Sequence, residues 1–526
     1  MNLKTTMKTI YNLLSLTLAT IILSSCASQN NGAKAQEVAP QIELTQSSVT
    51  SLDANTVKLV MQAKGKGVAV GAFFIYFYDT PPQAKLEGYY EKYGRTYVNG
   101  GTANTPSTLL LDNGKQDEDP RTGVFAYTFH TKDWPTGWYT MRVAATNRPA
   151  PGDWLAASRD FRIKVGDAPP LQTSNIPSAV NKIIYMKEGV YPPFPSLYVF
   201  PNGDLATSFS TRTHRSHKDN SGGSVSFISK DNGKTWTKNS APLIYQKWRT
   251  KDGRLVRPGV QGWVHVDASQ EEKLKKEHKV IMKVRPGTIA YLGGAYFETS
   301  TDNGKTWVRK EISMPSNIVG LMLYSQRPST LNTSKGVRLY AVYGLRSGTS
   351  KREVYFLRSD DDGKSWKCYP MYPDGLSDSA VGLTETAIEE AADGTIVAMM
   401  RSDPSGYLWE ATSADGGLTW TKPAKTSIWG FPADLIRLKD GRLLCAYGYR
   451  RSPMGIRAVI SRDNGKTWDI KQELIIRADG LGLEMDLGYP LLHQLPDGSI
   501  FCIYYITTDG YHNTQVDCTT FKLPQQ

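Results

Sequence analysis

Short runs of apolar residues, each bounded by a turn signal, follow one another along most of the chain. Between residues 39 and 166 apolar and polar positions alternate, which is typical of half-buried strands. The clearest of these runs are Thr56–Gln62, Ala72–Tyr78, Val124–His130, Trp138–Thr146 and Asp160–Val165. Beyond residue 181, further apolar strands flank the tight turns Pro201-Asn202-Gly203, Asp393-Gly394, Asp440-Gly441 and Pro496-Asp497-Gly498. The pattern predicts an all-β protein.

One sequence of eight residues recurs five times with the pattern S-x-D-x-G-x-[TS]-W. The copies begin at Ser229, Ser300, Ser359, Ser413 and Ser461. Gly and Asn tolerate the positive φ of a tight turn, and Asp can accept hydrogen bonds from the N–H groups of that turn. The Trp is large and apolar, so it is expected to pin the turn to a hydrophobic layer. Each copy therefore predicts a stabilised hairpin corner, and an array of such units predicts a repeat architecture.

These copies resemble the Asp-box (BNR) repeats of the sialidase superfamily, and the resemblance covers roughly residues 180–526. It implies a six-bladed β-propeller. We place the blades at about 190–240, 243–310, 318–370, 380–425, 428–470 and 484–523. The strand Lys182–Lys187 is expected to pair with the last blade and close the ring, which removes an exposed edge.

The remaining chain divides into an export signal and a smaller domain. Lys4 and Lys8 precede an apolar run that is too short for a stable membrane span and ends in Leu23-Ser24-Ser25-Cys26. The run resembles a bacterial lipobox, which implies cleavage before Cys26 and lipidation of that residue. We therefore predict a signal peptide at 1–25, a tether at 26–38, a β-sandwich domain at 39–166, a linker at 167–180 and the propeller at 181–526. The segment Pro135–Val143 resembles a late strand of an immunoglobulin-like sandwich.

A lipid-anchored protein of this kind is expected in the cell envelope of a Gram-negative bacterium, at the outer membrane or in the periplasm. We expect the smaller domain to act as a spacer, with carbohydrate binding as the alternative. For Cys502 and Cys518 the sequence allows a disulfide across the last two strands, and buried free thiols are the favoured interpretation.

Composition narrows the class of partner. The 526 residues include 46 Gly and 29 Pro, which suits a turn-rich all-β chain, and the net charge of +12 favours an anionic partner. No basic run is interleaved with aromatic residues as in nucleic-acid binders, so an acidic glycan is the better candidate. Seven His residues without ligand spacing predict no metal and no other cofactor, and we expect a monomer.

The turn glycines locate the working face of the predicted ring. Strand one of each blade is innermost, so its first residues should surround the mouth of the central channel. Counting back nine positions from the turn glycine gives Phe194, Glu385 and Tyr489 in blades one, four and six. Glu385 and Tyr489 are therefore expected to face one pocket, where the carboxylate can take the proton of a phenol that is otherwise a poor nucleophile.

The segments around these two residues resemble the sialidase family. Thr384-Glu385 through Arg401 resembles the stretch with the nucleophile-activating Glu and a substrate-binding Arg, and Gly488-Tyr489 resembles the nucleophilic Tyr segment. A Tyr nucleophile is a known exception among glycosidases. Arg residues at or just beyond the ends of strand two should also reach this face and can hold a carboxylate or sulfate. They are Arg212, Arg285, Arg346, Arg401 and Arg450, and Arg457 competes with Arg450 as the third Arg of the family.

The general acid is expected in the loop after strand two of blade one. The family places its acid/base Asp in this region, which makes Asp219 the candidate, with His214 as the alternative and His217 as a weaker one. The first Arg of the family is missing, because Pro193 occupies its position. A carboxylate-binding triad is therefore incomplete, and the substrate need not be sialic acid.

These observations predict an exo-acting glycoside hydrolase that releases a terminal acidic sugar. Tyr489 is the expected nucleophile, Glu385 its activator, and Asp219 or His214 the acid. Two other interpretations stay open: a propeller lyase acting on uronates, and a non-catalytic glycan-binding lipoprotein.

Overall fold

The computed structural model describes most of the chain from residue 42 onward. The described residues are 42–65, 72–78, 96–97, 108–111, 118–121, 123–132, 136–146, 157–170, 173–187, 190–212, 222–277, 279–322, 328–349, 351–373, 382–402, 405–451, 453–481, 486–508 and 514–524. The export signal, Cys26 and the tether lie outside this range. No helix within the described part is long and apolar enough to cross a membrane.

The N-terminal region contains two sheets. One has the order β1-β2-β6, from strands Ile42–Asp53, Thr56–Gly65 and Val124–His130. The other has the order β4-β3-β7-β8, with β5 beside β3, from Thr96–Tyr97, Ala72–Tyr78, Gly137–Thr146, Ala157–Val165 and Thr108–Leu111. The predicted strands are present, and the immunoglobulin-like classification stays a prediction.

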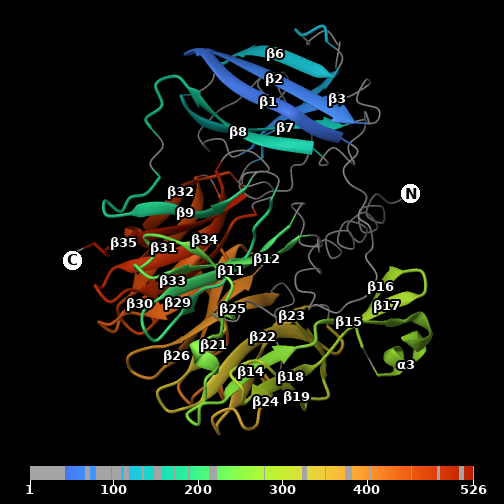
Figure 1. The fold of residues 1–526 in the computed structure, drawn as a ribbon, viewed down its shortest axis with the longest axis vertical. Coiled ribbons are helices and arrows are strands. Elements are labelled where there is room, and N and C mark those ends of the chain that lie inside the picture. Colours follow the sequence, from blue (N-terminus) through green and yellow to red (C-terminus); the bar gives the residue numbers. More distant parts are fainter. Residues whose placement is uncertain are drawn as a thin grey trace, which may run out of the picture.

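The larger region consists of six antiparallel sheets in succession, which Figure 1 shows below the N-terminal pair. Blade one has β10 (Tyr198–Val199), β11 (Leu205–Thr211), β12 (Gly223–Ser229) and β13 (Thr237–Asn239). Blade two has β14 (Leu255–Val260), β18 (Ala295–Ser300) and β19 (Val308–Ile312). Blade three has β20 (Ile318–Met322), β21 (Thr330–Asn332), β22 (Arg338–Arg346), β23 (Arg352–Ser359) and β24 (Lys367–Pro370).

The remaining three blades have four strands each. Blade four has β25 (Leu383–Glu390), β26 (Ile396–Ser402), β27 (Tyr407–Ser413) and β28 (Ala424–Trp429). Blade five has β29 (Ala433–Arg437), β30 (Leu443–Tyr449), β31 (Met454–Ser461) and β32 (Leu474–Gly480). Blade six has β33 (Gly488–Gln494), β34 (Ile500–Thr507) and β35 (Thr514–Phe521), and its fourth strand is β9 (Val180–Met186). The pairing of β9 with β35 confirms the predicted closure, since the start of the region supplies the outer strand of its last blade.

The recurring sequence forms the predicted corner. In the first copy, Asp231 Oδ1 accepts from the backbone N–H of Thr235 at 2.8 Å and from the Ser229 hydroxyl at 2.8 Å. Asn232 and Gly233 have φ of 60° and 84°, which is the backbone that this turn requires. A Cβ on Gly233 would lie 2.6 Å from the Phe501 ring of blade six, so the corner packs against the preceding blade around the ring.

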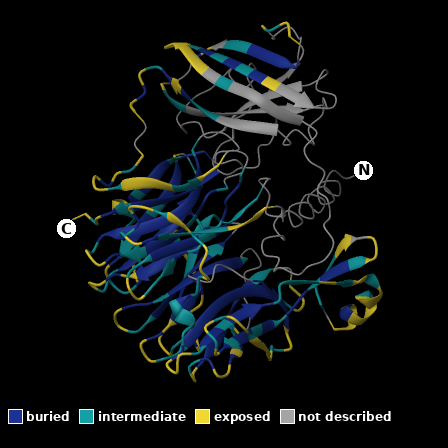
Figure 2. Ribbon diagram, viewed as in Figure 1, coloured by how far each residue is buried: buried dark blue, intermediate teal, exposed yellow. Residues whose placement is uncertain are grey.

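Both faces of the second strand are buried in blades three, four and six. Figure 2 shows the dark centre of the blades, and β22, β26 and β34 are buried almost throughout. Clusters of buried apolar residues join blade two to three, three to four, four to five, five to six and six to one. The four described cysteines are buried thiols with no disulfide among them, as the sequence favoured.

The strands of blade two differ in position from those that the sequence predicted. Its second strand is β14, and residues between β14 and β18 form a separate hairpin sheet of β15 (Trp263–Asp267), β17 (Thr288–Leu292) and β16 (Ile281–Arg285) with helix α3 (Glu271–Lys276). Arg285 lies at the end of β16 in this insertion. The prediction that it ends strand two of the blade was therefore wrong, because the insertion itself contains strands that look like blade strands in sequence.

Contacts also join the N-terminal domain to blade five. The Arg162 guanidinium of β8 donates to the backbone carbonyls of Asp479 at 3.2 Å and Gly480 at 3.0 Å. The domain therefore contacts the end of β32.

The carboxyl group of Glu410 makes stability depend on pH. The Trp468 indole of blade five donates to it at 2.7 Å, and burial raises the pKa of Glu410 to about 7 although the indole opposes this. The folded protein thus binds a proton at Glu410 more tightly than the unfolded chain does. The contribution of this proton to the free energy of unfolding is complete below pH 4.5 and is lost as pH rises through 7. We expect the free energy of unfolding of Glu410→Gln, relative to the wild type, to rise by about 2 kcal/mol between pH 4.5 and pH 8. One pKa unit corresponds to about 1.4 kcal/mol, and the partial exposure of the carboxyl group reduces the value that the whole pKa shift would give.

Urea unfolding at several pH values measures this difference. Glu277→Gln, at the exposed end of α3, is the control and should follow the wild type at every pH. Parallel pH curves for Glu410→Gln and the wild type would contradict the assignment.

Candidate active site

Three residues at or before the start of the innermost strands have positive φ at equivalent places. Phe194, Glu385 and Tyr489 have φ of 56°, 33° and 50°, although none is glycine. Irregular register follows at two of these places, between Thr384 and Ala387 and between Gly488 and Leu491. Positive φ is costly for a residue with a Cβ, and bulges re-aim side chains at functional sites. The backbone therefore places these three side chains at one position in three different blades.

The side chains of Tyr489 and Glu385 meet. The Tyr489 hydroxyl donates to Glu385 Oε1 at 2.7 Å, and Glu385 is only 8% exposed. The position counted back from the turn glycines thus located a real contact between blades four and six. The catalytic roles of the two residues stay predictions.

Glu385 has a second partner on the same blade. Arg401 Nη1 donates to Glu385 Oε2 at 2.7 Å, so each carboxylate oxygen holds one donor. The Arg401 guanidinium also lies over the Phe431 ring, 4.4 Å from its centroid. A charge-assisted bond at one oxygen fixes the orientation of the carboxylate and aims the other oxygen at the phenol.

The surroundings keep the phenol neutral. Burial raises the pKa of Tyr489 well above 10, and the negative charge of Glu385 raises it further, while Arg401 and Arg450 oppose both effects. Proton loss at neutral pH therefore requires an acceptor in contact, and Glu385 is placed to be that acceptor.

An aromatic cluster supports Tyr489, and of its members the sequence pattern indicated only Phe194. The Phe194 ring meets it edge-on at 4.6 Å, and the Tyr505 ring lies at 6.0 Å. Tyr191 and Tyr505 both donate to the carboxylate of Asp486. Tyr505 and Asp486 lie in a strand interior and a loop without a repeat signature, so only their three-dimensional neighbours reveal them.

Arg450 carries a second guanidinium group beside this site. Its buried Nε has no hydrogen-bond partner among the described residues, and the group lies 4.9 Å from the Phe431 centroid. Since Arg401 lies over the same ring, the two cations flank Phe431. The effect of Arg450 on the pKa of Tyr489 places its charge near the phenol.

The other predicted Arg residues fall into different settings. Arg212 lies just beyond β11, 5.8 Å from the Phe194 centroid. Arg346 ends β22 as expected, but it donates to Glu353 at 2.9 Å and to the backbone carbonyls of Tyr372 and Pro373 after β24. Arg457 forms an ion pair with Glu473 at 2.5 Å, so Arg450 is favoured over it. Arg285 lies in the insertion of blade two.

The predicted acid is not located. Asp219, His214 and His217 lie in residues 213–221, outside the described residues. Pro193, at the position of the missing Arg, is buried beside Phe194. Among the described residues no group of three or more His, Cys, Asp or Glu side chains could hold a metal ion.

The comparisons with known proteins agree with the repeat pattern. Residues 279–502 match the BNR repeat-like domain, and residues 227–238 match the BNR/Asp-box repeat. The chain carries BNR repeats. A crystal structure of a protein of unknown function from Dyadobacter fermentans is similar at 28% identity with a TM-score of 0.53, covering 67% of this chain and all of that one.

Two glycosidase structures overlap less well. The NanB sialidase from Streptococcus pneumoniae is 14% identical with a TM-score of 0.42, over 88% of this chain and 83% of its own. The α-L-arabinanase from Penicillium chrysogenum is 14% identical with a TM-score of 0.41, over 67% of this chain and 99% of its own.

Proposed function

We propose that the protein is an exo-acting glycoside hydrolase that releases a terminal acidic sugar from glycans or polysaccharides. The observation that carries the proposal is the 2.7 Å hydrogen bond from the Tyr489 phenol to the Glu385 carboxylate. This is the arrangement that a phenol nucleophile needs, because the base must already contact the proton that leaves during attack.

The proposed reaction has two displacements. Tyr489 Oη attacks the anomeric carbon while its proton passes to Glu385, and the glycosidic bond breaks as an acid protonates the leaving oxygen. Asp219 or His214 supplies that proton. Water, deprotonated by the same residue, then attacks the anomeric carbon and releases the sugar, and Glu385 returns the proton to the phenolate. A neutral nucleophile avoids repulsion with an anionic substrate, whereas a carboxylate nucleophile would not.

The cationic side of the site supports an acidic substrate. Arg450 has an unpartnered buried Nε, and Arg401 stands beside it across Phe431. Pro193 occupies the position of the first family Arg, and Arg212 of the same blade lies 5.8 Å from the Phe194 centroid. Because Arg401 is already bonded to Glu385, Arg450 and Arg212 suit a uronate or another singly charged sugar.

Replacement of the phenol tests the mechanism. We expect Tyr489→Phe to lose at least about 1,000-fold in kcat/KM, and Glu385→Gln about 100- to 10,000-fold, because general base catalysis contributes on that order. Turnover is measured with sialyllactose, oligogalacturonates and aryl glucuronides, with mass spectrometry of the released sugar. Tyr369→Phe in the outer strand β24 is the matched control and should keep full activity.

The measurement also separates the rival reactions. Unchanged turnover in Tyr489→Phe would remove Tyr489 from the mechanism. An unsaturated uronate product would identify a lyase instead, and binding of acidic glycans without any released sugar would identify a binding protein.

The proposed location is the cell envelope, with a lipid on Cys26 as the anchor. We expect the wild type in the membrane fraction and Cys26→Ser in the soluble fraction, because a lipid chain is then absent. Fractionation of cells with immunodetection measures this. Cys368→Ser, which changes a buried thiol in β24, is the control, and a membrane-bound Cys26→Ser protein would contradict the anchor.

A further inference from the structure

The two middle strands of blade one, β11 and β12, carry serines on one face and mainly apolar side chains on the other. On one face, Leu205, Phe209 and Phe227 pack against blade six. The opposite face carries small polar residues in register, because Ser208 pairs with Ser226, Ser210 pairs with Ser224, and Ser226 pairs with Asn239. A second strand that is only half-buried on one face is unusual here, since the second strands β22, β26 and β34 are buried on both faces.

The polar face is turned toward blade two, since the other face packs on blade six. Among the described residues, no cluster of buried apolar side chains joins blades one and two, whereas each of the other five junctions has one. The inner part of this junction is closed by Tyr198 stacked on Tyr245, with centroids 4.3 Å apart. The outer part stays open.

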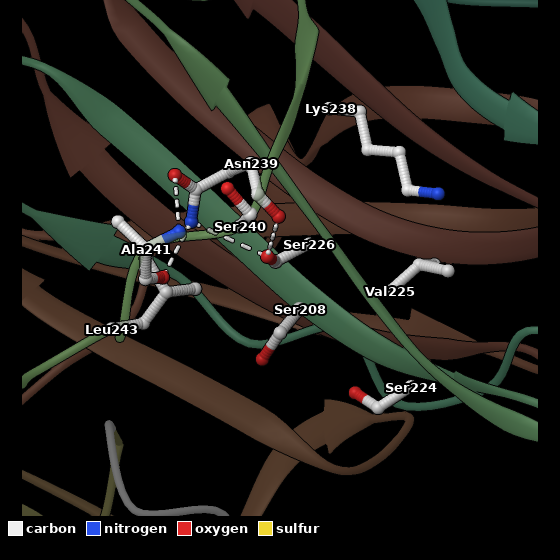
Figure 3. A pocket seen from close by; sticks show the side chains of 9 residues that line it. All are labelled: Ser208, Ser224, Val225, Ser226, Lys238, Asn239, Ser240, Ala241 and Leu243. Atoms are coloured by element: carbon white, nitrogen blue, oxygen red, sulfur yellow. Dashed lines mark hydrogen bonds between the residues drawn. The ribbon is translucent and has the colours of Figure 1, made fainter.

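The open part is a groove of about 400 Å³. Figure 3 shows Ser208 and Ser226 on neighbouring strands beside Asn239, with Ala241 and Leu243 forming the adjoining wall. The Ser226 hydroxyl donates to the backbone carbonyl of Asn239 at 2.8 Å. The side-chain amide of Asn239 donates to the backbone carbonyl of Ala241 at 2.8 Å. The groove thus has a pre-organised polar floor and an apolar side, and its size lies in the range of small-molecule sites.

The groove has an uncharged polar floor formed by Ser208, Ser226 and Asn239. Lys238 also borders it, but Lys238 alternates with Asn239 along β13 and pairs in register with Phe227 of the apolar face. Hydroxyl and amide groups without a cation suit a neutral ligand that both donates and accepts hydrogen bonds. A sugar ring meets both demands, since its hydroxyl edge fits the serines and its C–H face fits Ala241 and Leu243.

We propose that this groove binds an uncharged segment of a carbohydrate chain, separately from the candidate active site. The choice of a carbohydrate rests on the proposed function, because the polymer that carries the terminal acidic sugar is the natural ligand. The position supports it as well. Ser208 is hydrogen-bonded to the Ser196 hydroxyl at 2.8 Å, and Ser196 lies two residues after Phe194, which contacts Tyr489. The row of hydroxyls therefore leads from the rim toward the centre of the ring.

Affinity electrophoresis tests the groove with the full-length protein. Gels contain soluble arabinogalactan, β-1,4-galactan, arabinan or xyloglucan as probes. We expect the wild type and Tyr489→Phe to be retarded equally by at least one of them. Ser224→Trp and Ser240→Trp place an indole in the groove from exposed positions, and each should weaken the apparent Kd at least tenfold while turnover of a small aryl glycoside is kept.

The control is Val308→Trp, which puts the same side chain on a 62% exposed position of β19 in blade two and should bind as the wild type does. The proposal would be overturned if none of the four polysaccharides retarded the wild type. It would also be overturned if both groove variants were retarded as strongly as the wild type. Self-association that Ser224→Trp abolishes would also overturn it, since this face would then join two copies. Retained turnover in Tyr489→Phe would contradict the mechanism but would not affect the binding result. A failure of the proposed function can therefore be distinguished from a failure of the groove proposal.

Discussion

The hydrogen bond between Tyr489 and Glu385 depends on the ring being closed, because its two residues belong to blades six and four. β9 holds blade six in place as its outer strand, and the positive φ of both residues turns their side chains out of the sheet ladder. Arg401 then fixes the carboxylate with its own hydrogen bond to the other oxygen. Closure, backbone strain and one ion pair together create a base in contact with a phenol, which neither blade could form alone.

Local sequence rules predicted the features that repeat. The Asp-Asn-Gly turns, the Trp after each turn and the inner-strand count all depend on residues within one blade, so a repeated pattern reveals them. The count identified Phe194, Glu385 and Tyr489, which share a positive φ in blades one, four and six. The rule on the ends of strand two failed for Arg285, where an insertion with its own strands interrupts blade two. Neither rule identified Asp486 and Tyr505, whose importance comes only from contacts across blades. Arg457 was likewise indistinguishable from Arg450 until the pairing with Glu473 was visible.

Electrostatics divide the centre of the ring into two sides. Arg401 and Arg450 flank Phe431 on blades four and five, while blade one contributes Phe194 and the Asp486 carboxylate is held by two phenols. Arg212 of blade one also lies near this centre, 5.8 Å from the Phe194 centroid. The charge of an anionic sugar would therefore lie toward these guanidinium groups and away from the Asp486 carboxylate.

The central claim is that the phenol oxygen of Tyr489 forms a bond to the sugar. Peptide mass spectrometry of enzyme quenched during turnover measures this most directly. The account predicts one added sugar residue on the peptide that contains Tyr489 and none on that peptide in Tyr489→Phe. An adduct on another side chain, or turnover without any adduct on Tyr489, would contradict it.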